Sequence, residues 1–172
     1  LQFVVAGFLH DIGMVFIDRR ALHSPKELGQ EERAMLPRHT RIGAALIQAT
    51  DAWDEEVAEC AREHHERWNG SGYPDGKGGS EASLPARLMS YIDTYAALVS
   101  PRPHRDPLTP KAACERLEKA VEMGLFDPTL LIAVLGALRE TRLVTTDSPP
   151  PRRRENFIEL VEASAKMQPK EF

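Results

Sequence analysis

Four histidines and two aspartates have the residue types and the spacing of a metal centre. They are His10, Asp11, His39, His64, His65 and Asp93. Three intervals between them measure 28, 25 and 28 residues, and each interval is about one helix plus a turn. We therefore expect these side chains to come from successive helices of a bundle and to meet in its interior.

The adjacent pairs His10-Asp11 and His64-His65 indicate more than one metal ion. Neighbours on a helix point about 100° apart, so each pair would serve two ions, or bridge them, more readily than chelate one. Two metals about 3.5–4 Å apart can clamp a phosphodiester and activate water at neutral pH. Histidine with carboxylate suits iron, manganese or zinc. An aspartate has two oxygens to share, which makes Asp11 the predicted bridge.

A structural interpretation of the same residues stays open. A lone His-Asp dipeptide is weak evidence, and His64-His65-Glu66 could cap a helix end, where cationic residues are favourable. Asp93, however, lies in an otherwise apolar helical segment. A buried carboxylate without a partner is expensive, so it needs a cation or hydrogen-bond donors. Taken together, the six residues favour the metal centre.

The elements that must position these residues are predicted to be helices. Apolar residues at steps of three or four define a stripe on one of them, and Thr109-Pro110 and Asp127-Pro128 each place a cap residue before a first-turn proline. The expected helices cover about 1–10, 29–47 with a kink or break at Pro37, 53–65 and 84–99, two more begin at these prolines, and Gly124 ends the earlier of the two.

Two segments are predicted to lack regular structure. Five glycines lie between positions 69 and 79, which excludes a helix or strand there. From about 145 the chain takes on a proline- and arginine-rich linker composition, and a last helix over roughly 155–167 follows. We therefore expect a domain over 1–144 and a linker with a C-terminal helix over 145–172.

The composition limits the classes of function. A chain of 172 residues that is 42% hydrophobic can bury the core of one domain, and its net charge of −4 argues against a nucleic-acid polymer as partner. No run approaches a membrane span and no signal peptide is visible, so we expect a cytoplasmic location without membrane contact. The chain opens at Leu1 inside an apolar segment, and we expect it to be a piece of a longer polypeptide.

At these motifs the sequence resembles the HD-GYP family, a branch of the HD phosphohydrolase superfamily. The block from His64 to Pro74, which reads HHERWNGSGYP, is highly specific, whereas the His-Asp pair alone is not. The other matching segments are His10–Gly13, His39–Gly43, Ala86-Arg87 leading to Asp93, and Arg102–Arg105.

This resemblance implies an all-α, HD-domain-like helical bundle with a GYP loop and additional C-terminal helices. It implies an enzyme that hydrolyses cyclic di-GMP to pGpG or GMP with two or more divalent metals, iron or manganese above all. The six residues named first would be the metal ligands, with Asp11 also catalytic. Tyr73 would line the pocket, and Arg102 and Arg105 would grip phosphate, to which the arginine fork is suited. Further expected partners are a sensory domain upstream or a signalling protein, and a homodimer is left open.

Four departures from the family pattern keep other functions open. Met14 replaces the lysine that follows the HD motif, Ala96 replaces an aspartate, and His104 replaces a tyrosine. A further ligand usual about thirty residues before His10 would lie ahead of Leu1. The first alternative is therefore a catalytically weakened regulatory module that binds nucleotide or a signalling protein. The second is hydrolysis of another cyclic dinucleotide or of a nucleoside monophosphate.

Overall fold

The computed structural model describes residues 2–17, 35–101 and 105–140, and within these ranges it is all-α with no β-strand. The all-α fold class expected from the sequence is confirmed. The α-helices are α1 (Gln2–Leu9), α4 (Arg38–Gln48), α5 (Glu55–Glu63), α6 (Leu84–Val99), α7 (Pro110–Glu122) and α8 (Leu131–Glu140), and two 3-10 helices are η1 (Ile12–Phe16) and η2 (Gly79–Glu81).

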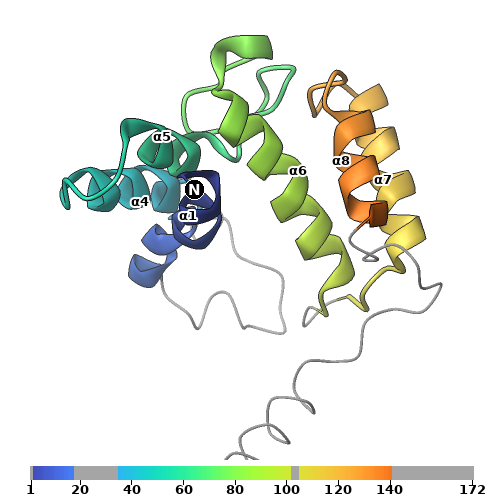
Figure 1. Cartoon of the computed structure of the whole chain (residues 1–172), viewed down its shortest axis with the longest axis horizontal. Coiled ribbons are helices and arrows are strands. Elements are labelled where there is room, and N and C mark those ends of the chain that lie inside the picture. Colours follow the sequence, from blue (N-terminus) through green and yellow to red (C-terminus); the bar gives the residue numbers. More distant parts are fainter. Residues whose placement is uncertain (1, 18–34, 102–104, 141–172) are drawn as a thin grey trace, which may run out of the picture.

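Helix α6 divides the helices into two groups, with α1, α4 and α5 on one side and the α7–α8 hairpin on the other (Figure 1). Each group has its own apolar core. The first core joins α1, α4 and α5 to Met89 of α6, and the second joins α6 to α7 and α8 around the fully buried Tyr91 and Leu117. Because α6 contributes to both cores, it connects the two groups into one domain.

Local sequence signals account for the ends of α6 and α7. Pro85 lies in the first turn of α6, after Ser83. At the start of α7 the Thr109 hydroxyl accepts a hydrogen bond from the backbone N–H of Ala112 at 3.2 Å, which satisfies one of the free donors of the first turn. The helix ends at Glu122, and Gly124 then takes a φ of 73°, a conformation that favours glycine.

Two glycines let η1 pack directly against α4. A Cβ added to Gly13 would lie 2.0 Å from the carbonyl oxygen of His39 and 2.7 Å from the backbone N of Gly43. Only a residue without a side chain fits at this contact. The glycine of the His10–Gly13 segment therefore sets the distance between the turn that carries Asp11 and the helix that carries His39.

Helix α4 begins at Arg38 with Pro37 as its N-cap, so the break expected at Pro37 is confirmed. One boundary differs from the prediction. Helix α8 begins at Leu131 and not at Pro128, because the Asp127 carboxylate accepts hydrogen bonds from both the backbone N–H and the hydroxyl of Thr129 and so holds a separate turn. The predicted linker and helix over 145–172, together with positions 102–104, lie outside the described residues.

None of the helices in the described ranges has both the length and the apolar character that a membrane span requires.

Candidate metal centre

Four of the six predicted ligands converge at the junctions between helices of the first group. Asp11 lies in the turn between α1 and η1, His39 lies in the first turn of α4, and His64 and His65 directly follow α5. One potential ligand atom from each of these four residues lies within 4.8 Å of all the others. Segments far apart in the sequence thus meet here, as the spacing predicted.

The Asp11 carboxylate lies between the histidines. Its Oδ1 is 3.2 Å from Nε2 of His39 and 3.5 Å from Nε2 of His64, and its Oδ2 is 3.6 Å from Nε2 of His10. The two oxygens therefore face different histidines. This arrangement is compatible with the predicted role of Asp11 as a bridge between ions.

Backbone carbonyl groups fix the orientation of three imidazole rings. Nδ1 of His10, His39 and His64 donates to a carbonyl oxygen three residues earlier, at 2.9, 2.5 and 2.9 Å. A carbonyl can only accept, so the proton of each neutral ring is on Nδ1 and the lone pair is on Nε2. Orientation of a ligand ring by such an outer hydrogen bond is typical of metal-binding histidines.

The donor atoms fit a divalent cation. Nε2 of His39 and Nε2 of His64 are 3.5 Å apart, and both face the same Asp11 oxygen. Lone pairs and carboxylate charge at this distance repel one another unless a proton or a cation lies among them. Imidazole nitrogen with carboxylate oxygen suits iron, manganese or zinc, so the residues fit the group that the sequence predicted.

The site favours the ligand forms of Asp11 and His65, whereas His39 is held in its protonated form unless a cation replaces the proton. Partial burial opposes ionisation of Asp11, but Nε2 of His39 and of His64, when protonated, donates to its carboxylate and holds the pKa of the carboxyl well below its usual range. Burial, with a contribution from the neighbouring His64 and His39, lowers the pKa of His65 to about 2. Burial also acts to lower the pKa of His39, yet the hydrogen bonds with Asp11 and the Leu36 carbonyl and the nearby negative charges together raise it. A carboxylate and a neutral imidazole are both ligand forms.

His10 and Asp93 lie next to the four-residue cluster without belonging to it. The His10 ring packs edge-on against His64, with 4.9 Å between the ring centroids. Asp93 lies on α6, and its negative charge contributes to the raised pKa of His39. It also lines a neighbouring cavity. The role of both residues as ligands stays a prediction.

Of the predicted substrate contacts, Tyr73 lies beside the cluster. Its ring is 4.8 Å from the centroid of His65, and its backbone N–H donates to the carbonyl of His65 at 3.3 Å. Burial raises the pKa of Tyr73 to about 12, so the phenol keeps its proton and can donate it in a hydrogen bond. The peptide bond between Tyr73 and Pro74 is cis.

Arg105 is engaged with the backbone, and Arg102 lies outside the described residues. One terminal nitrogen of Arg105 donates to the carbonyls of Ala97 and Leu98 at 2.9 and 3.2 Å, near the end of α6. This contact satisfies carbonyl groups that the helix end leaves free. Any contact of Arg105 with phosphate would use its remaining donors.

Two buried glutamates hold the GYP loop, the glycine-rich segment 69–79 that contains Gly72-Tyr73-Pro74. Their role was not predicted from the sequence. Glu66 accepts hydrogen bonds from the backbone N–H groups of Asp75, Gly76 and Lys77 at 2.7 to 3.1 Å. Glu63 pairs with the Lys77 ammonium and accepts from the backbone N–H of Ser83. The only sequence signal was a glutamate directly after the histidine pair, beside a glycine-rich segment rich in free backbone donors.

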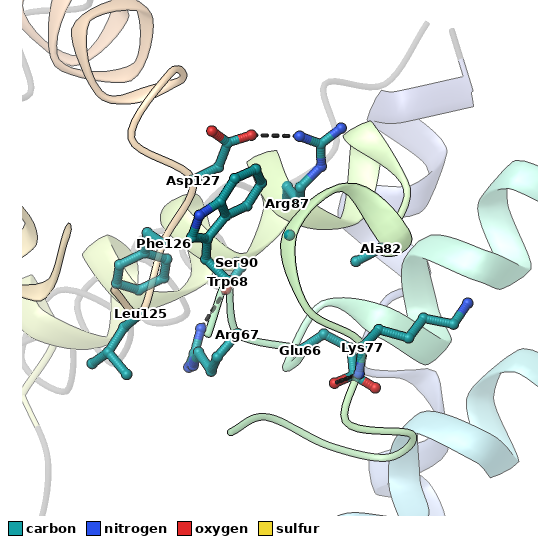
Figure 2. Close-up of a pocket in the computed structure, with 11 residues that line it drawn as sticks. Glu66, Arg67, Trp68, Lys77, Ala82, Arg87, Ser90, Leu125, Phe126 and Asp127 are labelled. Carbon is teal, nitrogen blue, oxygen red and sulfur yellow. Dashed lines mark hydrogen bonds and ion pairs between the residues drawn. The ribbon is translucent and has the colours of Figure 1, made fainter. Parts of the chain in front are cut away.

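A small pocket behind the loop is structural. Figure 2 shows Arg87 paired with Asp127 and Arg67 bonded to Ser90 around it, and the Arg67 guanidinium also lies 4.9 Å from the centre of the Phe126 ring. The volume of this small pocket is about 10 Å³, which is enough for about one water molecule. A second cavity of about 600 Å³ lies between α6 and α7, and Asp93, Arg105 and Arg116 line it. This second cavity is large enough for a nucleotide, whereas the small pocket is not.

The sequence model of the HD domain family matches residues 1–130. With that match, and with the site geometry above, the chain belongs to the HD domain family, and the HD-GYP type of domain predicted from the motifs is confirmed. One relative is the cyclic di-GMP phosphodiesterase response regulator RpfG of Xanthomonas campestris pv. campestris, which is 39% identical over 76% of this chain and 35% of its own length.

Further relatives extend the range of named substrates. The 3'3'-cGAMP-specific phosphodiesterase 2 of Vibrio cholerae is 34% identical over 76% of this chain and 25% of its own length. The cyclic di-GMP phosphodiesterase of Thermotoga maritima is 34% identical over 78% of this chain and 37% of its own length. The chain thus spans between a quarter and two fifths of these relatives.

A solved structure supports the fold. Bd1817, an HDG"Y"P protein from Bdellovibrio bacteriovorus, matches with a TM-score of 0.62 over 81% of this chain and 43% of that one. The sequences are 22% identical.

Proposed function

We propose that the chain is the catalytic part of a metal-dependent cyclic dinucleotide phosphodiesterase, and that it hydrolyses cyclic di-GMP to pGpG or GMP. The observation that carries this proposal is the cluster of Asp11, His39, His64 and His65, whose ligand atoms converge within 4.8 Å. The names of the relatives support the substrate class, because they are phosphodiesterases of cyclic di-GMP or of 3'3'-cGAMP.

The cluster would hold two or more divalent cations, with iron or manganese predicted. Asp11 and the three histidines would be ligands, joined by the neighbouring His10 and Asp93. When bound, the metals supply Lewis-acid stabilisation of the phosphodiester and a water nucleophile at neutral pH.

The protein's own residues would position the diester beside this centre. The carbonyl-bound rings of His39 and His64 keep their Nε2 atoms aimed at the Asp11 carboxylate. Glu66 holds the backbone of the loop that follows Tyr73. The protonated Tyr73 hydroxyl, beside His65, would donate a hydrogen bond to the substrate at the edge of the site.

Activity with matched variants tests the proposal. The purified chain, loaded with Fe²⁺ or Mn²⁺, is expected to cleave cyclic di-GMP to products that chromatography resolves. Asp11→Asn should reduce kcat by at least about a hundredfold, because it removes the charge shared by the histidines. Asp51→Asn is the control, since Asp51 is exposed, and asparagine tolerates its φ of 48°. Absence of cleavage by the metal-loaded wild type would exclude the proposal.

The regulatory alternative is favoured by one observation. Met14 lies in η1, three residues after Asp11, at the position where the resemblance implies a lysine. Without that cation, the chain would bind the dinucleotide and retain it. Binding of cyclic di-GMP with no cleavage under the conditions above would establish this alternative. The particular dinucleotide, the upstream partner and the cytoplasmic location also stay predictions.

A further inference from the structure

The cavity between α6 and α7 adjoins the metal centre. Arg67 lines the cavity and follows the cluster residue His65 by two positions, and the predicted ligand Asp93 lines it from α6. A ligand with one phosphate at the metal centre would therefore extend into this space. The cavity volume of about 600 Å³ is in the range of small-molecule sites.

The charged side chains along the cavity are three arginines and one aspartate. They are Arg67, Arg105, Arg116 and Asp93. The positive charges outnumber the negative charge, which favours an anionic ligand. Metals at the neighbouring cluster would add further positive charge.

Two of the three arginines are already held by protein groups. Arg67 donates to the Ser90 hydroxyl and lies over the Phe126 ring, and Arg105 donates to the carbonyls at the end of α6. The exposed Arg116 differs, because its guanidinium makes no hydrogen bond or ion pair within 2–17, 35–101 and 105–140. Its backbone is nevertheless fixed, since Ala113 and Leu117 on the same helix are fully buried.

A cyclic dinucleotide carries two phosphodiesters, and only one can occupy the cleavage position at a time. The other must find charge compensation elsewhere in the site. We propose that Arg116 binds this second phosphate and so selects cyclic dinucleotides over ligands with a single phosphate. The inference rests on the proposed substrate class. The arginine fork suits phosphate oxygens, and among the cavity arginines Arg116 is the one whose whole guanidinium is uncommitted within the described residues.

Binding measurements test this assignment without depending on turnover. Calorimetric titration of the full chain with Mn²⁺ present would compare cyclic di-GMP, supplied as a hydrolysis-resistant phosphorothioate analogue, with GMP, which has one phosphate. Arg116→Gln should weaken the affinity for cyclic di-GMP about tenfold relative to the affinity for GMP, as expected for one charge-assisted contact at a partly exposed site. The control is Lys119→Gln, because Lys119 is an exposed cation of the same helix that does not line the cavity.

Three results are informative. A tenfold loss of affinity in Arg116→Gln, with wild-type affinity in Lys119→Gln, would support the assignment. This holds even when the wild type binds cyclic di-GMP without cleaving it, because absence of cleavage refutes only the proposed hydrolysis. Equal losses in both variants, or no loss in either, would overturn the assignment and leave the proposed hydrolysis standing. A wild type that binds no cyclic di-GMP would overturn both.

Discussion

At the residue scale, protonation is decided by which neighbour each carboxylate has. Asp11 and Asp127 both have pKa values below the usual range, although burial acts on both in the opposite direction. For Asp11 the opposing partners are histidines at the metal centre. For Asp127 they are Thr129 and Arg87, which connect the turn before α8 to α6. The first carboxylate is therefore a ligand candidate and the second a structural link.

The free energy of unfolding of Asp127→Asn should depend less on pH in the acidic range than that of the wild type. The folded-state pKa of Asp127 lies below its unfolded value near 3.9. The carboxylate thus contributes stability that is present above pH 4 and is lost as the pH falls through the folded-state pKa. Urea unfolding at pH 7 should show the variant less stable by about 1–3 kcal/mol, because the pairing of the buried Asp127 with the half-buried Arg87 is weakened.

The difference between Asp127→Asn and wild type should shrink at pH 3, and Asp51→Asn should follow the wild type at both values. A variant that is equally destabilised at pH 3 and pH 7 would show that the Asp127 charge has no part in the link.

At the element scale, the sequence predicted helices better than it predicted what joins them. The helical spacing of α6 and the Thr109 cap of α7 are local signals, and both elements were confirmed. The stripe predicted on α6 was only partly right, because its members Leu84 and Ile92 are exposed. The start of α8 was placed too early, because Asp127-Pro128 also suits a turn and Arg87, 40 residues away, helps to hold it there. Contacts of that kind leave no local pattern.

The metal centre, too, was predicted in some of its residues and missed in others. The convergence of Asp11 with the three histidines followed from residue type and spacing. The roles of Glu63 and Glu66 did not, because most of their partners are backbone N–H groups, which are the same in every sequence, and the Lys77 partner of Glu63 lies 14 residues away. Arg116 was also missed, since an arginine on an amphipathic helix is ordinarily a surface charge, and only the packing of α7 beside α6 brings it to the cavity.

Gly13→Ala should disrupt the contact between η1 and α4. Its methyl group would lie 2.0 Å from the His39 carbonyl oxygen, so the backbone must move. We expect a destabilisation of about 1–3 kcal/mol or more, as for overpacking, and a weaker metal affinity because Asp11 and His39 separate.

Gly136→Ala is the matched control for Gly13→Ala. Nothing lies within 4 Å of a Cβ at Gly136 in α8, and alanine is the better helix former by about 1 kcal/mol, so this variant should be more stable than wild type. Calorimetry and metal titration would check both variants, and a Gly13→Ala protein with wild-type stability would refute the packing argument.

At the scale of the whole molecule, the metal centre lies entirely among elements of one helix group. Asp11, His39, His64 and His65 belong to the segments around α1, α4 and α5, whereas α7 and α8 pack on the other side of α6 (Figure 1). Binding of an ion would therefore tie together segments that are distant in sequence. The second core is held by apolar contacts and by the polar link of Asp127 with Arg87 and Tyr91, none of which belongs to the metal cluster.

Metal should stabilise the two groups unequally. Saturation with Mn²⁺ at a hundredfold above its Kd would raise stability by about 2.7 kcal/mol. Hydrogen exchange followed by mass spectrometry should show the added protection in α4 and α5, with less in α7 and α8, and chelation should reverse it. Equal protection throughout, or none, would contradict a metal centre confined to the first group.

The unequal exposure of the cluster has a consequence for how ions would enter and leave. The side chain of Asp11 is 48% exposed, whereas those of His39 and His64 are 3% and 0% exposed. The imidazole rings of His39 and His64 are buried among packed helices, so an ion would reach the cluster from the side of the exposed Asp11 carboxylate. Exchange of an ion would begin with the Asp11 oxygens, and its rate would be set by how often that single side chain swings away while the histidines stay in place.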